Sequence, residues 1–198
     1  MKHPLRLGVL GSGKGSNFRA IMEQINDGRL DAEVRIVISD VENAGILSLA
    51  RDFQIPGLYI RPGRFRAKLE PEIEEDVVRL LREASVELVI LAGFMRIVKE
   101  PVLRAFPGGI INIHPSLLPK FPGLEAWKQA LAAGETVTGC TVHYVDAGVD
   151  TGKILAQKTV PILPDDTPER LHARIQKAEH ELLPAVLAEI AARFRGLR

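Results

Sequence analysis

Alternation between apolar runs and amphipathic segments in the first half of the chain is the feature that most restricts its fold. Residues 16–26 and 70–84 carry apolar side chains at helical spacing, and Ser16 or Asn17 is expected to cap the first of these helices, with Gly28 ending it. Four runs are typical of buried strands: residues 5–10, 32–40, 57–60 and 87–93. We therefore expect an α/β fold with a doubly wound, mostly parallel sheet and helices on both faces.

The second half of the chain adds three strands and one long helix to this prediction. Apolar runs occupy residues 109–114, 136–145 and 153–162, and the short connection between the last two predicts an antiparallel edge. From Pro168 onward, apolar residues recur at helical spacing: Leu171, Ile175, Ala178, Leu182, Leu183, Val186, Leu187, Ile190 and Phe194. Because no linker or repeat interrupts the pattern, we expect a single domain over residues 1–198.

Charge and cysteine content exclude several classes of protein. The chain has 198 residues, a net charge of +1 and no run of five like charges, so we expect no nucleic-acid partner. Cys140 is the only cysteine, which excludes an internal disulfide and a multi-cysteine metal site. The first strand begins within a few residues of the start, and no apolar stretch is long enough to span a bilayer. We therefore expect no signal peptide, no membrane association and a cytoplasmic location.

A glycine-rich loop, "GSGKGSN" at residues 11–17, follows the first strand. Its alternate glycines match neither the dinucleotide pattern G-x-G-x-x-G nor a P-loop, because Lys14 precedes a glycine. The backbone N–H groups of Gly15, Ser16 and Asn17 would lie at a helix N-terminus, where unpaired donors and the helix dipole favour an anion. We expect this loop to bind the phosphate of a mononucleotide or sugar phosphate. A tight turn that binds nothing is the alternative.

The segment "GIINIHPSLLPKFPG", residues 109–123, places an amide and an imidazole together. In a strand, Asn112 and His114 share one face while Ile113 points into the core, and Pro115 ends the strand. Open parallel sheets bind ligands at this carboxyl end. An amide donor beside an imidazole suits stabilisation of negative charge on a carbonyl oxygen during attack at an acyl carbon. The alternative is that both side chains only bond the neighbouring turn.

A second glycine-bounded loop, "DAGVDTG", covers residues 146–152. Asp150 is the expected catalytic aspartate, because Gly152 would let the backbone approach a ligand beside it, whereas Asp146 is expected to form the turn. An aspartate near His114 would favour the imidazolium form and help to move protons. His143 has two interpretations, since it could orient a neighbouring residue or simply pack in the core.

The remaining histidines and serines carry no recognised catalytic pattern. No H-E-x-x-H motif occurs, the histidines and aspartate described above lack zinc-site spacing, and no G-x-S-x-G motif is present. We therefore expect neither a bound metal nor a covalent intermediate. A solvated or structural role is the expectation from position alone for His3, His172, Glu179 and His180.

Four motifs occur in one order along the chain: "GSGKGSN", "LAGFMRIV", "NIHPSLLPKFPG" and "HYVDAGVDTG". With them the chain resembles the glycinamide ribonucleotide formyltransferases, folate-dependent enzymes of purine synthesis, over essentially its whole length. "NIHPSLLP" with a later D-x-G is shared across the formyltransferase fold, whereas "GSGKGSN" points to the ribonucleotide branch. The resemblance implies one formyltransferase domain, with a Rossmann-like, mononucleotide-binding N-terminal half and a folate-binding, catalytic C-terminal half.

The resemblance also implies roles for individual residues. The substrate phosphate would be held by Gly15, Ser16 and Asn17, with Glu179 near the ribose. The implied cosubstrate is 10-formyltetrahydrofolate, and its contacts would be Arg66, Met95, Arg96, Ile97, Val98, Asp146, Ala147, Gly148 and Val149. Glu125 stands where the family more often has a histidine. The implied partners are these two small molecules, and the protein is expected to be a monomer or a homodimer.

The implied reaction is direct attack of the glycinamide ribonucleotide amine on the formyl carbon. The implied catalytic group is Asn112, His114 and Asp150. The amide and the protonated imidazole would stabilise the tetrahedral oxyanion. The aspartate would support the imidazolium and help to pass a proton, through water, from the attacking amine to the leaving folate nitrogen.

Three alternatives remain open from the sequence. Methionyl-tRNA formyltransferase shares "NIHPSLLP" but has a longer chain with an RNA-contacting domain and a basic surface. Formyltetrahydrofolate deformylase has a preceding regulatory domain, whereas Leu5 already starts the predicted core here. A nucleotide-sensing module that has lost its chemistry would not need all three residues of the implied catalytic group.

Overall fold

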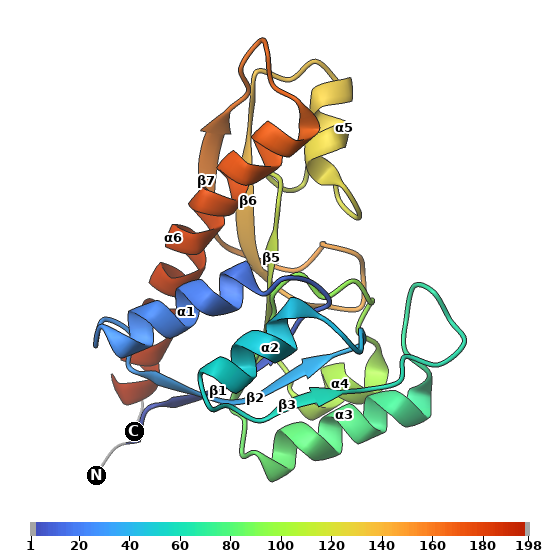
Figure 1. Ribbon diagram of the computed structural model, residues 1–198, viewed down its shortest axis with the longest axis vertical. Helices are drawn as coiled ribbons and strands as arrows, with labels where there is room; N and C mark the ends of the chain where they lie inside the picture. The colour runs from blue at the N-terminus through green and yellow to red at the C-terminus, as the bar shows by residue number, and fades with distance from the viewer. Residues whose placement is uncertain (1–2, 197–198) are drawn as a thin grey trace.

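Seven strands form one sheet in the computed structural model, which describes residues 3–196 (Figure 1). The strands are β1 (Leu5–Leu10), β2 (Ala32–Ser39), β3 (Gly57–Tyr59), β4 (Leu88–Leu91), β5 (Ile110–His114), β6 (Val137–Tyr144) and β7 (Ile154–Pro161). All seven predicted strands are present, with ends that differ by no more than two residues. Residues 1–2 and 197–198 of the predicted domain lie outside the described residues.

The strand order is β3-β2-β1-β4-β5-β6-β7, and its direction reverses at β1. The chain builds outward from β1 through β2 to β3, then returns to the other side of β1 with β4. Strands β1 to β5 pair in parallel, whereas β5–β6 and β6–β7 are antiparallel. The predicted doubly wound sheet with an antiparallel edge is confirmed. Ligands of such sheets bind outside the carboxyl ends of the strands, at the reversal.

In the described part of the chain, six helices surround the sheet: α1 (Ser16–Asn26), α2 (Gly45–Asp52), α3 (Pro71–Glu83), α4 (Glu100–Ala105), α5 (Ala126–Ala132) and α6 (Pro168–Gly196). The sequence pattern predicts α1, α3 and α6 and misses the other three. The missed helices have eight, six and seven residues. Segments this short complete too few turns for an apolar period to stand out.

The start of α1 differs from the prediction at one residue. Gly15, with φ 80°, is the N-cap, and no side chain caps the helix. The expectation that Ser16 or Asn17 caps α1 is therefore wrong. Because glycine carries no Cβ, it adopts this left-handed conformation without strain. Gly28, with φ 70°, follows the last turn and ends the helix as expected.

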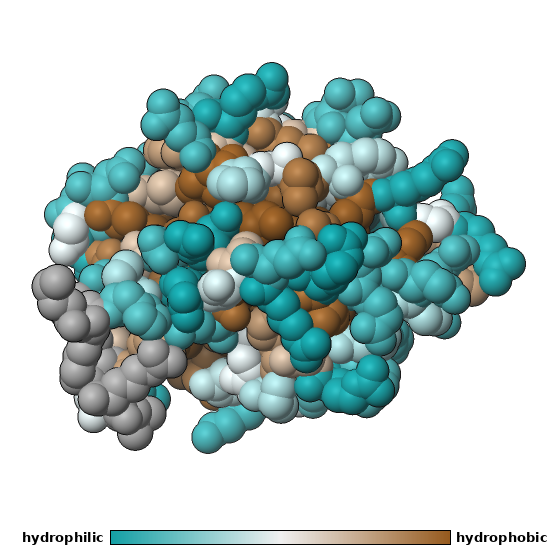
Figure 2. All heavy atoms as spheres, turned by 90° about the horizontal axis from the view of Figure 1, so that it is seen from below, coloured by the Kyte–Doolittle hydropathy of each residue, from teal (hydrophilic) through white to brown (hydrophobic). Residues whose placement is uncertain are grey.

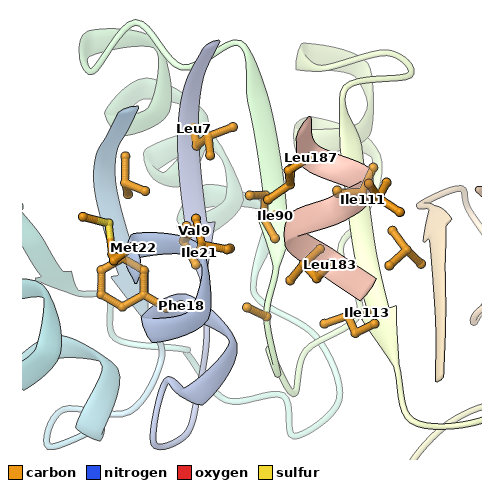
Figure 3. Packing of buried hydrophobic residues seen from close by; sticks show 14 of the residues in the cluster. Leu7, Val9, Phe18, Ile21, Met22, Ile90, Ile111, Ile113, Leu183 and Leu187 are labelled. Carbon is orange, nitrogen blue, oxygen red and sulfur yellow. The ribbon is translucent and has the colours of Figure 1, made fainter. Parts of the chain in front are cut away.

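Two apolar clusters cover the two faces of the sheet. Helices α1, α2 and α6 pack over one face through one apolar cluster. In this cluster Phe18 and Ile21 of α1 lie beside Val9, and Leu183 and Leu187 of α6 lie beside Ile90 and Ile111 (Figure 3). Helices α3 and α4 pack over the opposite face through a second cluster: Val77, Val78, Leu81 and Val102. The predicted cover of helices on both faces is confirmed, and the carboxyl ends of the strands stay free to form a site.

The surface seen from below is largely polar, with apolar side chains showing between the charged ones (Figure 2). Within residues 3–196, no helix has the length and apolar content needed to cross a membrane.

The difference in burial between two leucines predicts different effects of their substitution on the free energy of unfolding. Leu187 is fully buried between α6 and the sheet, whereas Leu163 is 44% exposed. Leu187→Ala is expected to lower the free energy of unfolding by about 2–5 kcal/mol, because it removes buried methyl groups and leaves a cavity. Leu163→Ala should change it by less than about 0.5 kcal/mol. Urea unfolding of both variants measures this, and equal losses would contradict the assigned core.

Candidate active site

The loops after β1, β4 and β5 meet at the carboxyl edge of the sheet. The Ser12 amide donates to the Gly93 carbonyl at 3.0 Å, which joins the glycine-rich loop to the segment after β4. Leu91 at the end of β4 pairs with Asn112 on β5. The glycine-rich loop, the 92–98 segment and the "NIH" strand end therefore line one edge of the sheet, as the sequence predicts.

The glycine-rich loop is shaped by close packing against α2. A Cβ on Gly15 would lie 2.9 Å from the Cα of Ile46, so only glycine fits there. The first backbone bond of the helix runs from the Arg19 amide to the Gly15 carbonyl at 2.9 Å. The amides that precede residue 19 form the open N-terminal turn of α1, where helices leave donors without intrahelical partners. This geometry suits an anion.

Asn17 and Glu179 lie side by side although 162 positions separate them in the sequence. The Asn17 Nδ2 donates to Glu179 Oε2 at 2.9 Å, and both residues are buried. Burial raises the pKa of Glu179 to about 7, against the smaller lowering effect of the Asn17 hydrogen bond. The Asn17 Oδ1 is buried without a hydrogen-bond partner among the described residues. The structure thus joins two of the predicted substrate residues.

Asn112, His143 and Asp150 form a hydrogen-bonded group above the end of β5. The Asn112 Nδ2 lies 3.1 Å from His143 Nε2 and 3.4 Å from Asp150 Oδ1. The other nitrogen of His143, Nδ1, lies 2.8 Å from the Tyr144 carbonyl, so a proton on Nδ1 leaves Nε2 to accept from the amide. Of its two interpretations, the contacts of His143 agree with orienting its neighbours.

His114 lies between two acceptors. Its Nδ1 is 3.3 Å from Asp150 Oδ2, and its Nε2 is 2.8 Å from the Phe121 carbonyl. The Gly123 amide donates to the same Asp150 Oδ2 at 2.8 Å. Asp150 therefore joins both predicted catalytic partners, Asn112 and His114, through its two carboxylate oxygens.

Burial has the largest effect on the pKa of His114. Burial lowers the pKa of His114, and this effect exceeds the raising effects of the Asp150 charge and the Phe121 carbonyl. Asp150 thus favours the imidazolium, as expected, and the predicted contact exists, but burial outweighs this effect in the free protein. For Asp150, burial raises the pKa, but the neighbouring His143, the hydrogen bond from the Gly123 amide and the charge of His114 together outweigh it. The pKa of Asp150 is therefore lowered, which favours the carboxylate.

The 146–152 loop is held by its first aspartate. Asp146 Oδ1 accepts from the Gly148 amide at 3.0 Å and from the Thr151 hydroxyl at 2.7 Å, which confirms its predicted turn-forming role. A Cβ on Gly152 would lie 1.8 Å from the Tyr144 carbonyl oxygen. Gly152 is thus required by its approach to the protein's own backbone, which is a different reason from the approach to a ligand that the sequence suggests. Ala147, Gly148 and Val149 are exposed.

The residues predicted to contact folate differ in exposure. Met95 is 54% exposed, whereas Val98 is buried in the core, so its side chain does not face solvent. The Ile97 amide donates to the Ala67 carbonyl at 2.8 Å. The Arg96 side chain is held inside the protein, on Asp40 and on the carbonyls of Phe65 and Arg66.

A partly buried polar cluster that the sequence pattern did not reveal supports the loop after β5. The Thr141 hydroxyl donates to the Ser116 carbonyl at 2.6 Å and accepts from the Leu118 amide at 3.1 Å. Gln157 Nε2 reaches the same hydroxyl and the Leu118 carbonyl, both at 2.9 Å. Alternation along β6 places Thr141 on the face of His143, but nothing in the sequence singles out Gln157. In residues 3–196, no group of three or more histidine, cysteine or acidic side chains could hold a metal ion.

The fold and the site at the carboxyl edge of the sheet together define a doubly wound α/β protein. The polar side chains at this edge suit a group-transfer reaction. The model of the formyl transferase family matches residues 5–187. The chain therefore belongs to the formyl transferase family. Its phosphoribosylglycinamide formyltransferase relative from Bacillus subtilis is 42% identical over 93% of this chain and 94% of its own length. The predicted resemblance to the glycinamide ribonucleotide formyltransferases is confirmed.

Solved structures and longer relatives agree with this family. Glycinamide ribonucleotide transformylase 1 from Symbiobacterium toebii is similar with a TM-score of 0.92 and 44% identity, covering 97% of this chain and 90% of that one. The predicted formyltransferase fold is confirmed. The trifunctional purine biosynthetic protein adenosine-3 of Drosophila pseudoobscura pseudoobscura is 49% identical over 94% of this chain. The chain spans only 14% of the length of that relative.

Because Glu179 is buried and its pKa is raised, we expect the stability of the protein to depend on pH. The unfolded chain ionises near the ordinary pKa of 4.5, whereas the folded protein keeps this proton to about 7. The contribution of Glu179 to the free energy of unfolding is therefore fully present below pH 4.5. This contribution is lost as the pH rises toward 7, by about 3 kcal/mol at 1.36 kcal/mol per pH unit. Glu179→Gln removes this loss, so its stability relative to the parent protein should be greater at pH 8 than at pH 5.

Urea unfolding at the two pH values measures the difference. Glu181→Gln is the matched control, because Glu181 lies on the same helix but is exposed and pairs with Lys158. It should change the free energy of unfolding by less than about 0.5 kcal/mol at either pH. An effect of Glu179→Gln that is the same at pH 5 and pH 8 would contradict the prediction.

Proposed function

We propose that the protein transfers the formyl group of 10-formyltetrahydrofolate to the amine of glycinamide ribonucleotide, in purine synthesis. The observation that carries this proposal is the contact of one carboxylate, Asp150, with both Asn112 and His114 at the carboxyl edge of the sheet. The family supports the reaction class, since the similar full-length relative is named a phosphoribosylglycinamide formyltransferase. A cytoplasmic location and a monomeric or homodimeric state remain predictions.

The substrate phosphate is proposed to bind at the N-terminal turn of α1, at Gly15, Ser16 and Asn17. Open amides and the helix dipole favour an anion at this turn. Glu179 is proposed to bind the ribose, because its carboxylate lies 2.9 Å from the Asn17 side chain. The N-terminal half of the one domain thus supplies the phosphate site, and the last helix completes it.

The folate is proposed to bind across the catalytic group, along residues 95–98 and 146–149 and near Arg66. Three apolar side chains are exposed on segments that adjoin the catalytic group: Met95, Leu124 and Val149. Gly123, just before Leu124, donates to Asp150, which itself follows Val149. Apolar walls with a few polar groups suit an aromatic ligand. In this proposal the C-terminal half of the domain supplies the chemistry and most of the folate site.

The proposed reaction is direct attack of the substrate amine on the formyl carbon, through a tetrahedral oxyanion. The Asn112 amide can supply one hydrogen to this oxyanion, because its 3.4 Å contact with Asp150 is long and weak. The ring of His114 is the nearby group that can become positive. Negative charge on the oxyanion raises the pKa of a neighbouring histidine, so the imidazolium disfavoured by burial becomes favourable as the reaction proceeds. The proton that His114 takes would come from the attacking amine and would pass on to the leaving folate nitrogen.

In the protonated form of His114, both ring N–H groups would have acceptors already in place, at Asp150 and at the Phe121 carbonyl. The Asp150 carboxylate would hold the imidazolium. It would also help to pass the proton, through water, from the attacking amine to the leaving folate nitrogen.

An absorbance assay of folate product tests the proposed function. Product that forms from 10-formyltetrahydrofolate only after glycinamide ribonucleotide is added is the expected result. Product with water alone would identify a deformylase instead. No product under either condition would contradict transferase activity and favour a binding protein.

Two substitutions test the proposed catalytic group. Asn112→Ala and Asp150→Asn are each expected to lower turnover about 10²- to 10³-fold, because each removes stabilisation of charge in the transition state. Both variants should still bind the ribonucleotide in calorimetry, since neither residue is assigned to that site. Asn26→Ala and Asp52→Asn, at exposed positions outside the proposed site, are the matched controls. Near-normal turnover in either test variant would contradict the assignment.

A further inference from the structure

A chain of hydrogen bonds crosses the point where the strand order reverses. The Ser12 hydroxyl donates to Asp40 Oδ1 at 2.5 Å and accepts from the Met95 amide at 2.9 Å. The other carboxylate oxygen, Asp40 Oδ2, accepts from Arg96 Nε at 2.7 Å. Ser12 follows β1, Asp40 follows β2, and Met95 and Arg96 follow β4. Three neighbouring strands of the sheet are thereby joined at their carboxyl ends.

The same arginine reaches a fourth segment. Arg96 Nη1 donates to the Phe65 carbonyl at 2.6 Å and to the Arg66 carbonyl at 2.5 Å. Residues 65 and 66 belong to the connection between β3 and α3. These bonds of the Arg96 guanidinium to Asp40, Phe65 and Arg66 all end on the protein itself. The position of the Arg96 side chain in the predicted folate segment therefore has a structural explanation that needs no direct contact with a ligand.

Burial makes the Asp40–Arg96 pair sensitive to the loss of either partner. The side chains are 2% and 16% exposed. Removal of one member of a buried ion pair leaves an uncompensated charge, whereas buried pairs as a class add little net stability over apolar packing. A buried pair at the junction of four segments therefore acts mainly on their relative positions.

The two ends of this network reach the two proposed substrate sites. Ser12 belongs to the glycine-rich loop proposed to hold the ribonucleotide phosphate. Met95 and Arg96 begin the segment proposed to contact the folate. In a reaction between two bound molecules, misplacement of one by about 1 Å can lower the rate about 10²-fold. A rigid connection between the two loops controls this separation.

We infer that Asp40 and Arg96, linked through Ser12, are positioning residues that hold the formyl-donor segment 95–98 in register with the ribonucleotide phosphate loop. The inference rests on the proposed function. It assigns the Arg96 side chain a role through Asp40 and the 65–66 carbonyls. Asp40 acts in the same way, because both of its carboxylate oxygens bond within the protein.

Steady-state kinetics of Asp40→Asn test the inference. This variant keeps the size of the side chain but leaves the Arg96 charge uncompensated. The KM for 10-formyltetrahydrofolate should rise about tenfold or more, because part of the donor-binding segment loses its position before the donor binds. The kcat at saturating donor should fall as well, because the two bound substrates lose their relative position, whereas the calorimetric Kd for glycinamide ribonucleotide should stay within about threefold. Calorimetry with tetrahydrofolate provides a readout independent of turnover.

Asp166→Asn is the matched control for a purely structural effect. Asp166 forms a similarly buried pair with Arg174, at 1% and 28% side-chain exposure, in the connection before α6. Both variants are expected to lower the melting temperature, but only Asp40→Asn should raise the KM for the formyl donor. Equal KM values for the two variants would overturn the inference.

Ser12 supplies a milder test in case Asp40→Asn fails to fold. Ser12→Ala removes the hydroxyl between Asp40 and the Met95 amide but leaves the ion pair in place. It should raise the KM for the donor, and Ser12→Thr, which restores a hydroxyl, should reverse part of this rise. A donor KM for Ser12→Ala equal to that of the parent protein would overturn the inference. An inactive parent protein would instead contradict the proposed function, so the two failures are distinguishable.

Discussion

Parallel pairing of β1 with both β2 and β4 is the constraint on which the rest of this structure depends. Because the three strands run in one direction, their carboxyl ends open on the same edge, and the loops that follow them must meet there. The glycine-rich loop, Asp40 and the 92–98 segment are neighbours for this reason. Addition of β5 on the far side of β4 brings Asn112 and His114 to the same edge.

Burial and hydrogen bonding compete at the catalytic group, and the balance differs between its members. Burial outweighs the other effects at His114 and favours the neutral ring, whereas at Asp150 the Gly123 amide and the two histidines together outweigh burial and favour the carboxylate. The environment therefore favours the negative form of Asp150 and disfavours the positive form of the His114 ring beside it. In the proposed reaction, charge that develops on the substrate would shift this balance, so protonation of His114 accompanies catalysis instead of preceding it.

Much of the fold and part of the site follow from local sequence pattern. The strands were predictable because their apolar runs match burial on both faces, and the shared face of Asn112 and His114 follows from strand alternation. The short helices α2, α4 and α5 were not predictable, since their stability comes from packing and not from their own periodicity. The Asn17–Glu179 contact joins two ends of the chain, and only the family resemblance pointed to it.

By itself, the sequence determined the doubly wound sheet, the glycine-rich turn, and the amide and imidazole at one strand end. These features depend on residues close together in the chain, where backbone geometry and side-chain period act directly. Only the tertiary structure decided the lowered pKa of His114, the role of Gly152 and the Asp40–Arg96 connection. Each of these depends on how deeply a group is buried and which distant backbone or charge it meets, and no local pattern contains that information.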